Sequence, residues 1–156
     1  GARHQVAVTQ AHPELARERV PMVFDLSAGL YWRPEEGGLL FGMSNPDEPP
    51  GTNRCIDEKY LASMRERLAM LVPVTAGLGL RRIWAATIDF TPDHLPIIGP
   101  AGEALRGVWI AAGHEGLGVT TSLATAKLLA AQMLGGQGAI DATPYRIDRF
   151  FRGGRP

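Results

Sequence analysis

Residues 108–122 read Val-Trp-Ile-Ala-Ala-Gly-His-Glu-Gly-Leu-Gly-Val-Thr-Thr-Ser, and this stretch decides the fold. It predicts a strand over Val108–Ala112, a glycine-rich turn, and a helix from about Gly116 to Leu134. Such a turn presents backbone N–H groups and a helix N-terminus to whatever lies above it, so an electron-rich or anionic group is the expected ligand. Its glycines would let a flat ligand approach the main chain, because no Cβ stands in the way.

The rest of the chain predicts an α+β fold, in which an antiparallel sheet of at least four strands carries a covering helix. The apolar residues Leu61, Met64, Leu68 and Leu71 repeat at helical spacing and place that helix at Asp57–Leu71, before Pro73. The expected strands and hairpin arms are Gln5–Thr9, Pro21–Leu26, Leu30–Pro34, Gly38–Met43 and Leu80–Phe90, and a turn is expected at 91–94. The C-terminal helix has one charged residue, Lys127, and is therefore expected to be largely buried.

Composition restricts the classes of function. The chain has 156 residues with 16 acidic and 16 basic side chains, and it has no basic block of the kind that nucleic acids bind. Its apolar stretches are too short to span a membrane. Four scattered histidines and one cysteine, Cys55, predict neither a metal site nor an intrachain disulfide, and a single thiol fits the cytoplasm.

The glycine turn is also similar to a known phosphate-binding pattern. A strand followed by Gly116-x-Gly118 and a helix resembles the dinucleotide fingerprint G-x-G-x-x-G, although Thr121 stands in the place of the third glycine. No second strand is predicted after the helix, so a βαβ unit is not expected. An independent dinucleotide domain is therefore disfavoured, while a plain turn with glycines for tight packing stays open.

Two motifs together resemble one family, the D-amino-acid-oxidase-like FAD-dependent oxidoreductases. They are Gly-His-Glu-Gly-Leu-Gly at 113–118 and Thr-Pro-Asp-His-Leu-Pro-Ile-Ile-Gly at 91–99. The group includes glycine and sarcosine oxidases and the catalytic subunits of hydroxyproline, opine and cyanide-forming glycine dehydrogenases. The resemblance covers nearly the whole chain but only the second half of such a protein. It implies a portion of a substrate domain at 1–106 and the last strand, turn and helix of an FAD-binding domain at 107–156.

The resemblance also implies a cofactor site. The isoalloxazine ring of FAD would lie against the turn residues Gly113, His114, Glu115, Gly116, Leu117, Gly118, Val119 and Thr120. Family members that tether FAD through cysteine have it near Ala86, and Cys55 lies elsewhere, so non-covalent FAD is expected. The activity implied is oxidation of the C–N bond of a small amine or amino acid by hydride transfer to the flavin, after which the product imine hydrolyses.

Candidate substrate residues are Tyr31, Arg33 and His114. Tyr31 and Arg33 alternate along one strand and share a face, which lines a substrate pocket or is the solvated side of a hairpin. His114 faces the ligand or is a turn residue bonded to backbone. Where several amino-acid oxidases carry a carboxylate-binding arginine, this chain has Ile88, so the expected substrate is a secondary amine such as an imino acid or opine, and Arg33, Arg81 or Arg82 are possible replacements.

The N-terminus Gly1-Ala2 looks like a vector remnant, and no glycine fingerprint for the FAD pyrophosphate is present. We therefore expect the chain to need a missing N-terminal FAD-binding half, to be inactive and colourless alone, and to self-associate through the surface which that half would cover. The alternative is a non-catalytic binding or structural module with the same substrate-domain fold.

Overall fold

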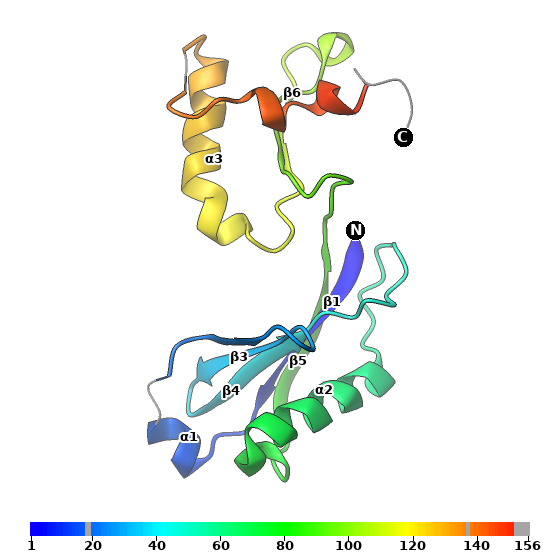
Figure 1. Ribbon diagram of the computed structural model, residues 1–156, viewed down its shortest axis with the longest axis vertical. Coiled ribbons are helices and arrows are strands. Elements are labelled where there is room, and N and C mark those ends of the chain that lie inside the picture. Colours follow the sequence, from blue (N-terminus) through cyan, green and yellow to red (C-terminus); the bar gives the residue numbers. More distant parts are fainter. Residues whose placement is uncertain (18–19, 137, 152–156) are drawn as a thin grey trace. The chain divides into compact units, whose positions relative to one another are not determined.

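The computed structural model describes residues 1–17, 20–136 and 138–151, and the chain divides into two compact units, Gly1–Thr87 and Ile88–Pro156 (Figure 1). The strands are β1 (Ala2–Thr9), β2 (Val23–Asp25), β3 (Leu30–Glu35), β4 (Gly38–Met43), β5 (Leu80–Ile88), β6 (Ile97–Pro100) and β7 (Trp109–Ala112). The α-helices are α1 (Pro13–Arg17), α2 (Glu58–Leu71) and α3 (Gly118–Met133). Short 3-10 helices are η1 (Pro73–Thr75), η2 (Glu103–Leu105), η3 (Thr143–Tyr145) and η4 (Ile147–Phe150).

The first unit is built on a five-stranded sheet in the order β2-β3-β4-β1-β5. The pairs β2–β3, β3–β4 and β1–β4 are antiparallel. The predicted hairpin is confirmed, because Glu35 pairs with Gly38 and the two residues between them, Glu36 and Gly37, both have positive φ. Two left-handed residues match the right-handed twist of the flanking strands and so fix the register of β3 on β4.

Helix α2 covers one face of this sheet and closes the hydrophobic core, which confirms the predicted covering helix. Its buried residues Leu61, Met64 and Leu68 pack against the buried strand residues Ala7, Leu30, Leu39, Phe41 and Met43. The carboxylate of Asp57 accepts the N–H of Tyr60 at 2.9 Å and so caps the helix. Leu71, expected on the buried side, is partly exposed because the helix ends at that residue.

The second unit contains the antiparallel pair β6–β7, in which Ile97 lies opposite Ala112 and Pro100 opposite Trp109. Helix α3 follows β7 and packs on both strands. It ends as its Gly135-Gly136 pair predicts: Gly135 has φ of 72° and the N–H of Gly136 donates to the carbonyl of Ala131 at 2.8 Å. The α+β prediction is confirmed, with an antiparallel sheet and few helices.

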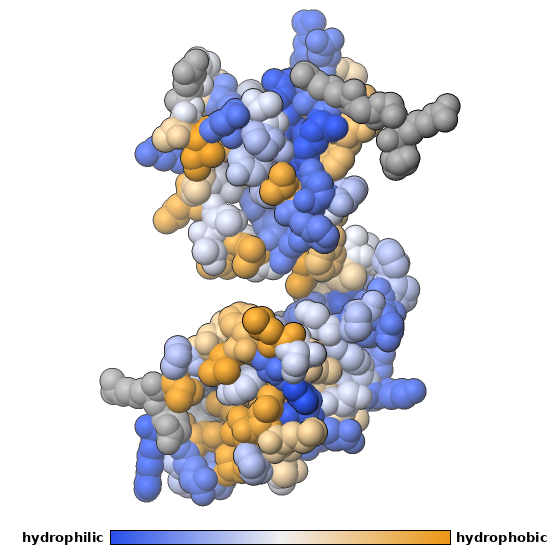
Figure 2. Space-filling model, in the orientation of Figure 1, coloured by the Kyte–Doolittle hydropathy of each residue, from blue (hydrophilic) through white to orange (hydrophobic). Residues whose placement is uncertain are grey.

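The prediction that α3 is largely buried is wrong. Val119, Leu123 and Leu134 are 92%, 85% and 86% exposed, and of the α3 residues only Thr125 and Leu128 are buried. A two-stranded sheet can cover only one side of a helix, whereas the apolar residues of α3 lie on several sides. Figure 2 shows apolar surface, in orange, on each of the two units.

The compact units meet between Thr87 and Ile88, while the sequence places its domain boundary between 106 and 107. The difference arises because β6, which precedes residue 106, pairs with β7 along its whole length. The boundary at 87 divides the chain by its internal contacts, whereas the boundary at 106 divides it by the expected substrate and cofactor roles. The functional division at 106 therefore stays a prediction.

The core predicts a simple stability contrast within α2. Met64 is fully buried and Met70 is 72% exposed on the same helix. We expect Met64→Ala to lower the free energy of unfolding by about 2–5 kcal/mol, because it leaves a cavity under the helix. Met70→Ala is the matched control and should change it by less than about 0.5 kcal/mol. Urea denaturation measures both, and equal losses would contradict this assignment of the core.

Candidate functional site

The turn between β7 and α3 has an unusual backbone. Gly113, Glu115 and Gly116 have φ of 74°, 51° and 85°, in the left-handed region that L-residues rarely adopt. A non-glycine residue in this region costs about 1–2 kcal/mol, so Glu115 is held there by its surroundings. The chain thereby reverses within a few residues and delivers the first turn of α3 at the end of β7.

The start of α3 has no side-chain cap among the described residues. Leu117 occupies the N-cap position, and its aliphatic side chain cannot accept a hydrogen bond. Gly118, Val119 and Thr120 are the first helical residues, whose N–H groups have no intrahelical partner. These donors, with the positive end of the helix dipole, suit an electron-rich or anionic group.

The three glycines of the turn are needed for two different reasons. A Cβ at Gly113 would overlap the methyl group of Thr91, so this glycine serves packing within the unit. A Cβ at Gly116 or Gly118 would meet only ordinary contacts, Ile88 Cδ1 at 3.8 Å and His114 Cβ at 3.7 Å respectively. A methyl group would therefore fit at Gly116 and at Gly118 without displacing a neighbour, and the absent Cβ lets a flat ring approach the backbone there.

His114 is held within the turn. Its Nδ1 lies 3.1 Å from the hydroxyl of Thr121, and that hydroxyl donates to the carbonyl of Leu117 at 3.0 Å. The Thr121 oxygen is then left to accept from Nδ1, which assigns a proton to Nδ1. The imidazole is partly buried and bonded to a side chain of α3, whereas the sequence left a backbone bond as one alternative. That His114 faces a ligand stays a prediction.

Tyr31 lies on the sheet face opposite α2, in the first unit. Its neighbours Leu30 and Trp32 pack towards the core on the other face. The Tyr31 ring stacks on His4 with centroids 5.7 Å apart and planes at 6°, and its hydroxyl is 3.0 Å from His4 Nε2. Gly42 lies opposite Tyr31 in the register, and a Cβ there would overlap the phenol ring. The missing side chain of Gly42 thus seats the Tyr31–His4 pair on the sheet.

Sequence reasoning missed His4. The expected strand begins at Gln5, whereas β1 begins at Ala2. Extending that strand by one residue would have placed His4 on the same face as Val6. Burial lowers the pKa of His4 and raises the pKa of Tyr31, so both groups are neutral near pH 7.

Arg33 shares the face of Tyr31, as its alternation with the core residues predicts, but its guanidinium is engaged by Glu35 at 2.7 Å. The other two arginines considered for substrate binding are also paired at this hairpin end. Arg81 contacts Glu36 at 2.6 Å and Arg82 contacts Glu35 at 3.3 Å. A substrate carboxylate would have to compete with these carboxylates for any of the three.

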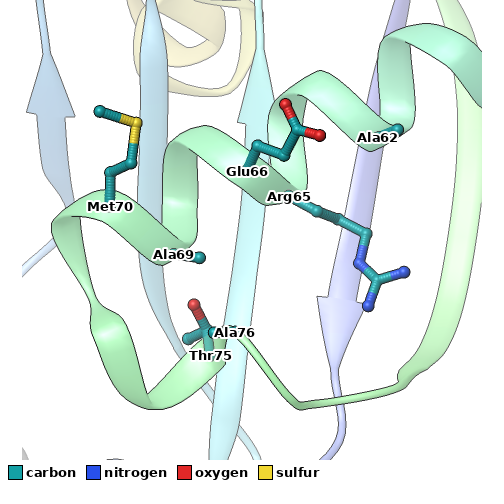
Figure 3. Close-up of a pocket in the computed structure, with 7 residues that line it drawn as sticks. All are labelled: Ala62, Arg65, Glu66, Ala69, Met70, Thr75 and Ala76. Carbon is teal, nitrogen blue, oxygen red and sulfur yellow. The ribbon is translucent and has the colours of Figure 1, made fainter.

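A separate groove of about 610 Å³ runs along the outer side of α2 and η1 (Figure 3). It is lined by Ala62, Arg65, Glu66, Ala69, Met70, Thr75 and Ala76. None of the predicted site residues belongs to it. Its one cation, Arg65, already donates to the carbonyl of Leu78 at 3.0 Å.

Neither a metal site nor a membrane-spanning helix is found in the described ranges 1–17, 20–136 and 138–151. Within these ranges no three His, Cys, Asp or Glu side chains gather so as to hold a metal ion. No helix in the same ranges has the length and apolar character needed to cross a membrane.

Comparison with known proteins identifies the family. Residues 1–132 match the family described as DAO, FAD dependent oxidoreductase. Dimethylglycine dehydrogenase of Rattus norvegicus is 31% identical over 95% of this chain, which covers 19% of that protein. Glycine oxidase of Pseudomonas aeruginosa is 31% identical over 77% of this chain and 32% of its own length.

Solved structures show the same fold. L-proline dehydrogenase from P. horikoshii superposes with a TM-score of 0.82 at 27% identity, covering 99% of this chain and 41% of that protein. Glycine oxidase from Geobacillus kaustophilus gives 0.79 at 28% identity, with 95% and 38% covered. The chain thus spans between about a fifth and two fifths of the length of these relatives.

The Tyr31–His4 pair makes stability depend on pH. Since the pKa of His4 is lowered in the folded state, the unfolded chain binds a proton more readily. The stability gained by keeping His4 neutral in the folded state is fully present above the ordinary pKa of about 6.5, and it is lost as the pH falls below that value. We expect His4→Gln to lose less stability than the unaltered chain between about pH 7.5 and pH 5 in urea titrations. Parallel losses in the two proteins would contradict a buried, neutral His4.

Proposed function

The chain belongs to the DAO family of FAD-dependent oxidoreductases, and on this premise we propose that the protein containing it oxidises the C–N bond of a small amine or amino acid. FAD, when bound, supplies the hydride acceptor for this chemistry. The observation that carries the proposal is the start of α3, which has no side-chain cap and lies beside two glycines where an added Cβ would clash with nothing.

In this proposal the turn residues Gly113–Thr120 hold the flavin ring through backbone groups. A hydride acceptor gains negative charge, and a helix N-terminus stabilises a nearby negative charge by about 0.3–1 kcal/mol or more when partly buried. Gly116 and Gly118 permit close approach, and the free N–H groups of the first turn supply donors. His114 lies in the same turn, where its Nδ1 is bonded to the Thr121 hydroxyl.

Tyr31, Arg33 and His114 are the proposed substrate contacts, and the structure adds His4 as the partner of Tyr31. The Tyr31–His4 pair is neutral near pH 7 and offers one hydroxyl and one imidazole for hydrogen bonds. Arg33 is occupied by Glu35, and Ile88 stands where the family resemblance implies a carboxylate-binding arginine. These features support a substrate recognised through its amine, such as an imino acid or an opine.

The remaining parts of the proposal concern the whole protein. We propose that residues 1–106 serve the substrate and 107–156 complete the FAD site, with the pyrophosphate held non-covalently by a further half of the protein. The low coverage of the relatives, 19% to 41%, supports such a half. The exposed apolar side chains of α3, Val119 and Leu123 among them, support self-association of the isolated chain. A cytoplasmic location stays a prediction from the single cysteine.

Gly116 and Gly107 provide a matched test of the turn. Their φ values are 85° and 81°, and a Cβ at either position meets nothing closer than 3.8 Å within the chain. Alanine therefore costs similar backbone strain at both, about 1–2 kcal/mol. We expect Gly116→Ala in the full-length protein to raise the Kd for FAD about tenfold or more, because the methyl group occupies the approach of the ring. Gly107→Ala should leave that Kd unchanged in fluorescence titrations. Equal Kd values for the two variants would reject the role of the turn.

Gly118 allows a second test in which stability and cofactor affinity move in opposite directions. Gly118 is the first helical residue and has no left-handed φ, so alanine there is expected to stabilise the fold by about 0.4–1 kcal/mol without a steric clash, because it restricts the unfolded chain. We expect Gly118→Ala to raise the thermal midpoint of the apoprotein while weakening FAD binding. Differential scanning calorimetry and flavin titration measure the two effects. If both quantities rose together, the added methyl group would not face the cofactor.

A further inference from the structure

The two motifs that identified the family are joined by side-chain contacts in the second unit. Glu115 in the turn accepts the N–H of Thr91 at 3.2 Å, and its carboxylate lies 3.0 Å from Nδ1 of His94. A second bond has its donor in the turn and its acceptor in the loop, because the N–H of Gly113 donates to the carboxylate of Asp89. Residues 89–95, which we call the 89–95 loop, therefore bind the turn at Gly113 and at Glu115.

The backbone at this junction is strained on both sides. Glu115 and His94 have φ of 51° and 58°, and their side chains bond to each other. Glycine would adopt either conformation without strain, yet glycine would have no carboxylate or imidazole to offer. The Glu115 side chain is only 18% exposed, and its carboxylate bonds to Thr91 and His94 of the loop.

The 89–95 loop is itself anchored from its other side. Arg149 of η4 donates to both carboxylate oxygens of Asp93, at 2.6 and 3.0 Å, and to the carbonyl of Leu95 at 2.7 Å. This guanidinium holds the pKa of Asp93 well below its usual range. Thr91 adds an internal bond, from its hydroxyl to the same Leu95 carbonyl, at 2.9 Å. The loop is thus a fixed support against which Glu115 can hold the turn.

We propose that Glu115 is a positioning residue that sets the conformation of the 113–118 turn, and through it the orientation of the backbone donors at the start of α3. The carboxylate itself does not contact the cofactor. The inference rests on the proposed function, because the quantity that Glu115 controls is the seating of FAD on the turn. It gives the Glu115 side chain a role in addition to the backbone contact that is proposed for the residues of the turn.

A purely local role for Glu115 predicts a different outcome. If the carboxylate only stabilised the fold, its removal would lower stability, and FAD affinity would fall only as far as the fold did. Replacement by glycine separates the two possibilities, since it relieves the left-handed strain while deleting the acceptor. The chain offers a matched control, Glu36, which has φ of 48° and a carboxylate bonded to Arg81 at 2.6 Å in the first unit.

The experiment compares Glu115→Gly, Glu115→Gln and Glu36→Gly in the full-length protein. The readouts are the thermal midpoint of the apoprotein, the exchange rate of the Thr91 amide proton, and the Kd for FAD. We expect Glu115→Gly to keep its midpoint within about 2 °C, to exchange the Thr91 proton faster, and to bind FAD about tenfold more weakly. Glu115→Gln should restore the slow exchange of the Thr91 proton and the affinity for FAD, because its amide oxygen still accepts the Thr91 N–H. Glu36→Gly should leave exchange and Kd unchanged.

The outcomes distinguish the inference from the function on which it rests. If the unaltered protein failed to bind FAD, the proposed function would fail, and this inference with it. If the unaltered protein bound FAD and Glu115→Gly bound it as tightly as Glu36→Gly did, the inference alone would be overturned. A loss of affinity in Glu115→Gly that only followed a fall in thermal midpoint, without rescue by Glu115→Gln, would also overturn it.

Discussion

The first turn of an α-helix carries backbone N–H groups that need an acceptor, and the two longest helices of this chain meet that need differently. In α2 the carboxylate of Asp57 accepts the N–H of Tyr60, so the chain itself supplies an acceptor at the start of the helix that covers the core. In α3 the equivalent position is Leu117, whose aliphatic side chain cannot accept a hydrogen bond. The donors of α3 are therefore available to a group from outside the chain, and the features of the turn follow from this requirement.

An uncapped helix start is useful to a ligand only if the preceding turn holds a fixed shape. The glycines cannot provide that rigidity, because they tolerate many conformations. The fixed shape comes from neighbours of the glycines: the Thr91 methyl group packs on Gly113, and Glu115 and Asp89 bond across to backbone N–H groups. The glycines leave the backbone accessible where a ring must approach. The hydrogen-bonded residues beside them keep that backbone in one conformation.

Local patterns predicted the elements well, and tertiary partners explain what they missed. The hairpin, α2 and the Gly135-Gly136 cap depend on residues close in sequence, and each is confirmed. The burial of α3 was wrong because hydropathy shows that a surface needs cover, not which segment supplies it. The Tyr31 partner His4 is 27 residues away, and Glu115 reaches Thr91 across 24 residues, so neither contact has a signal in a single short motif.

The charges of the first unit bear on which substrates such a protein can accept. Three arginines lie at the hairpin end, and each is paired with a carboxylate of Glu35 or Glu36. Recruiting one of them for a substrate carboxylate would require breaking an existing ion pair, so much of the gain in attraction would be cancelled. The Tyr31–His4 pair needs no such exchange, because both groups are neutral and partly buried. The balance of these terms favours recognition of the substrate by neutral hydrogen bonds over recognition by a dedicated cation.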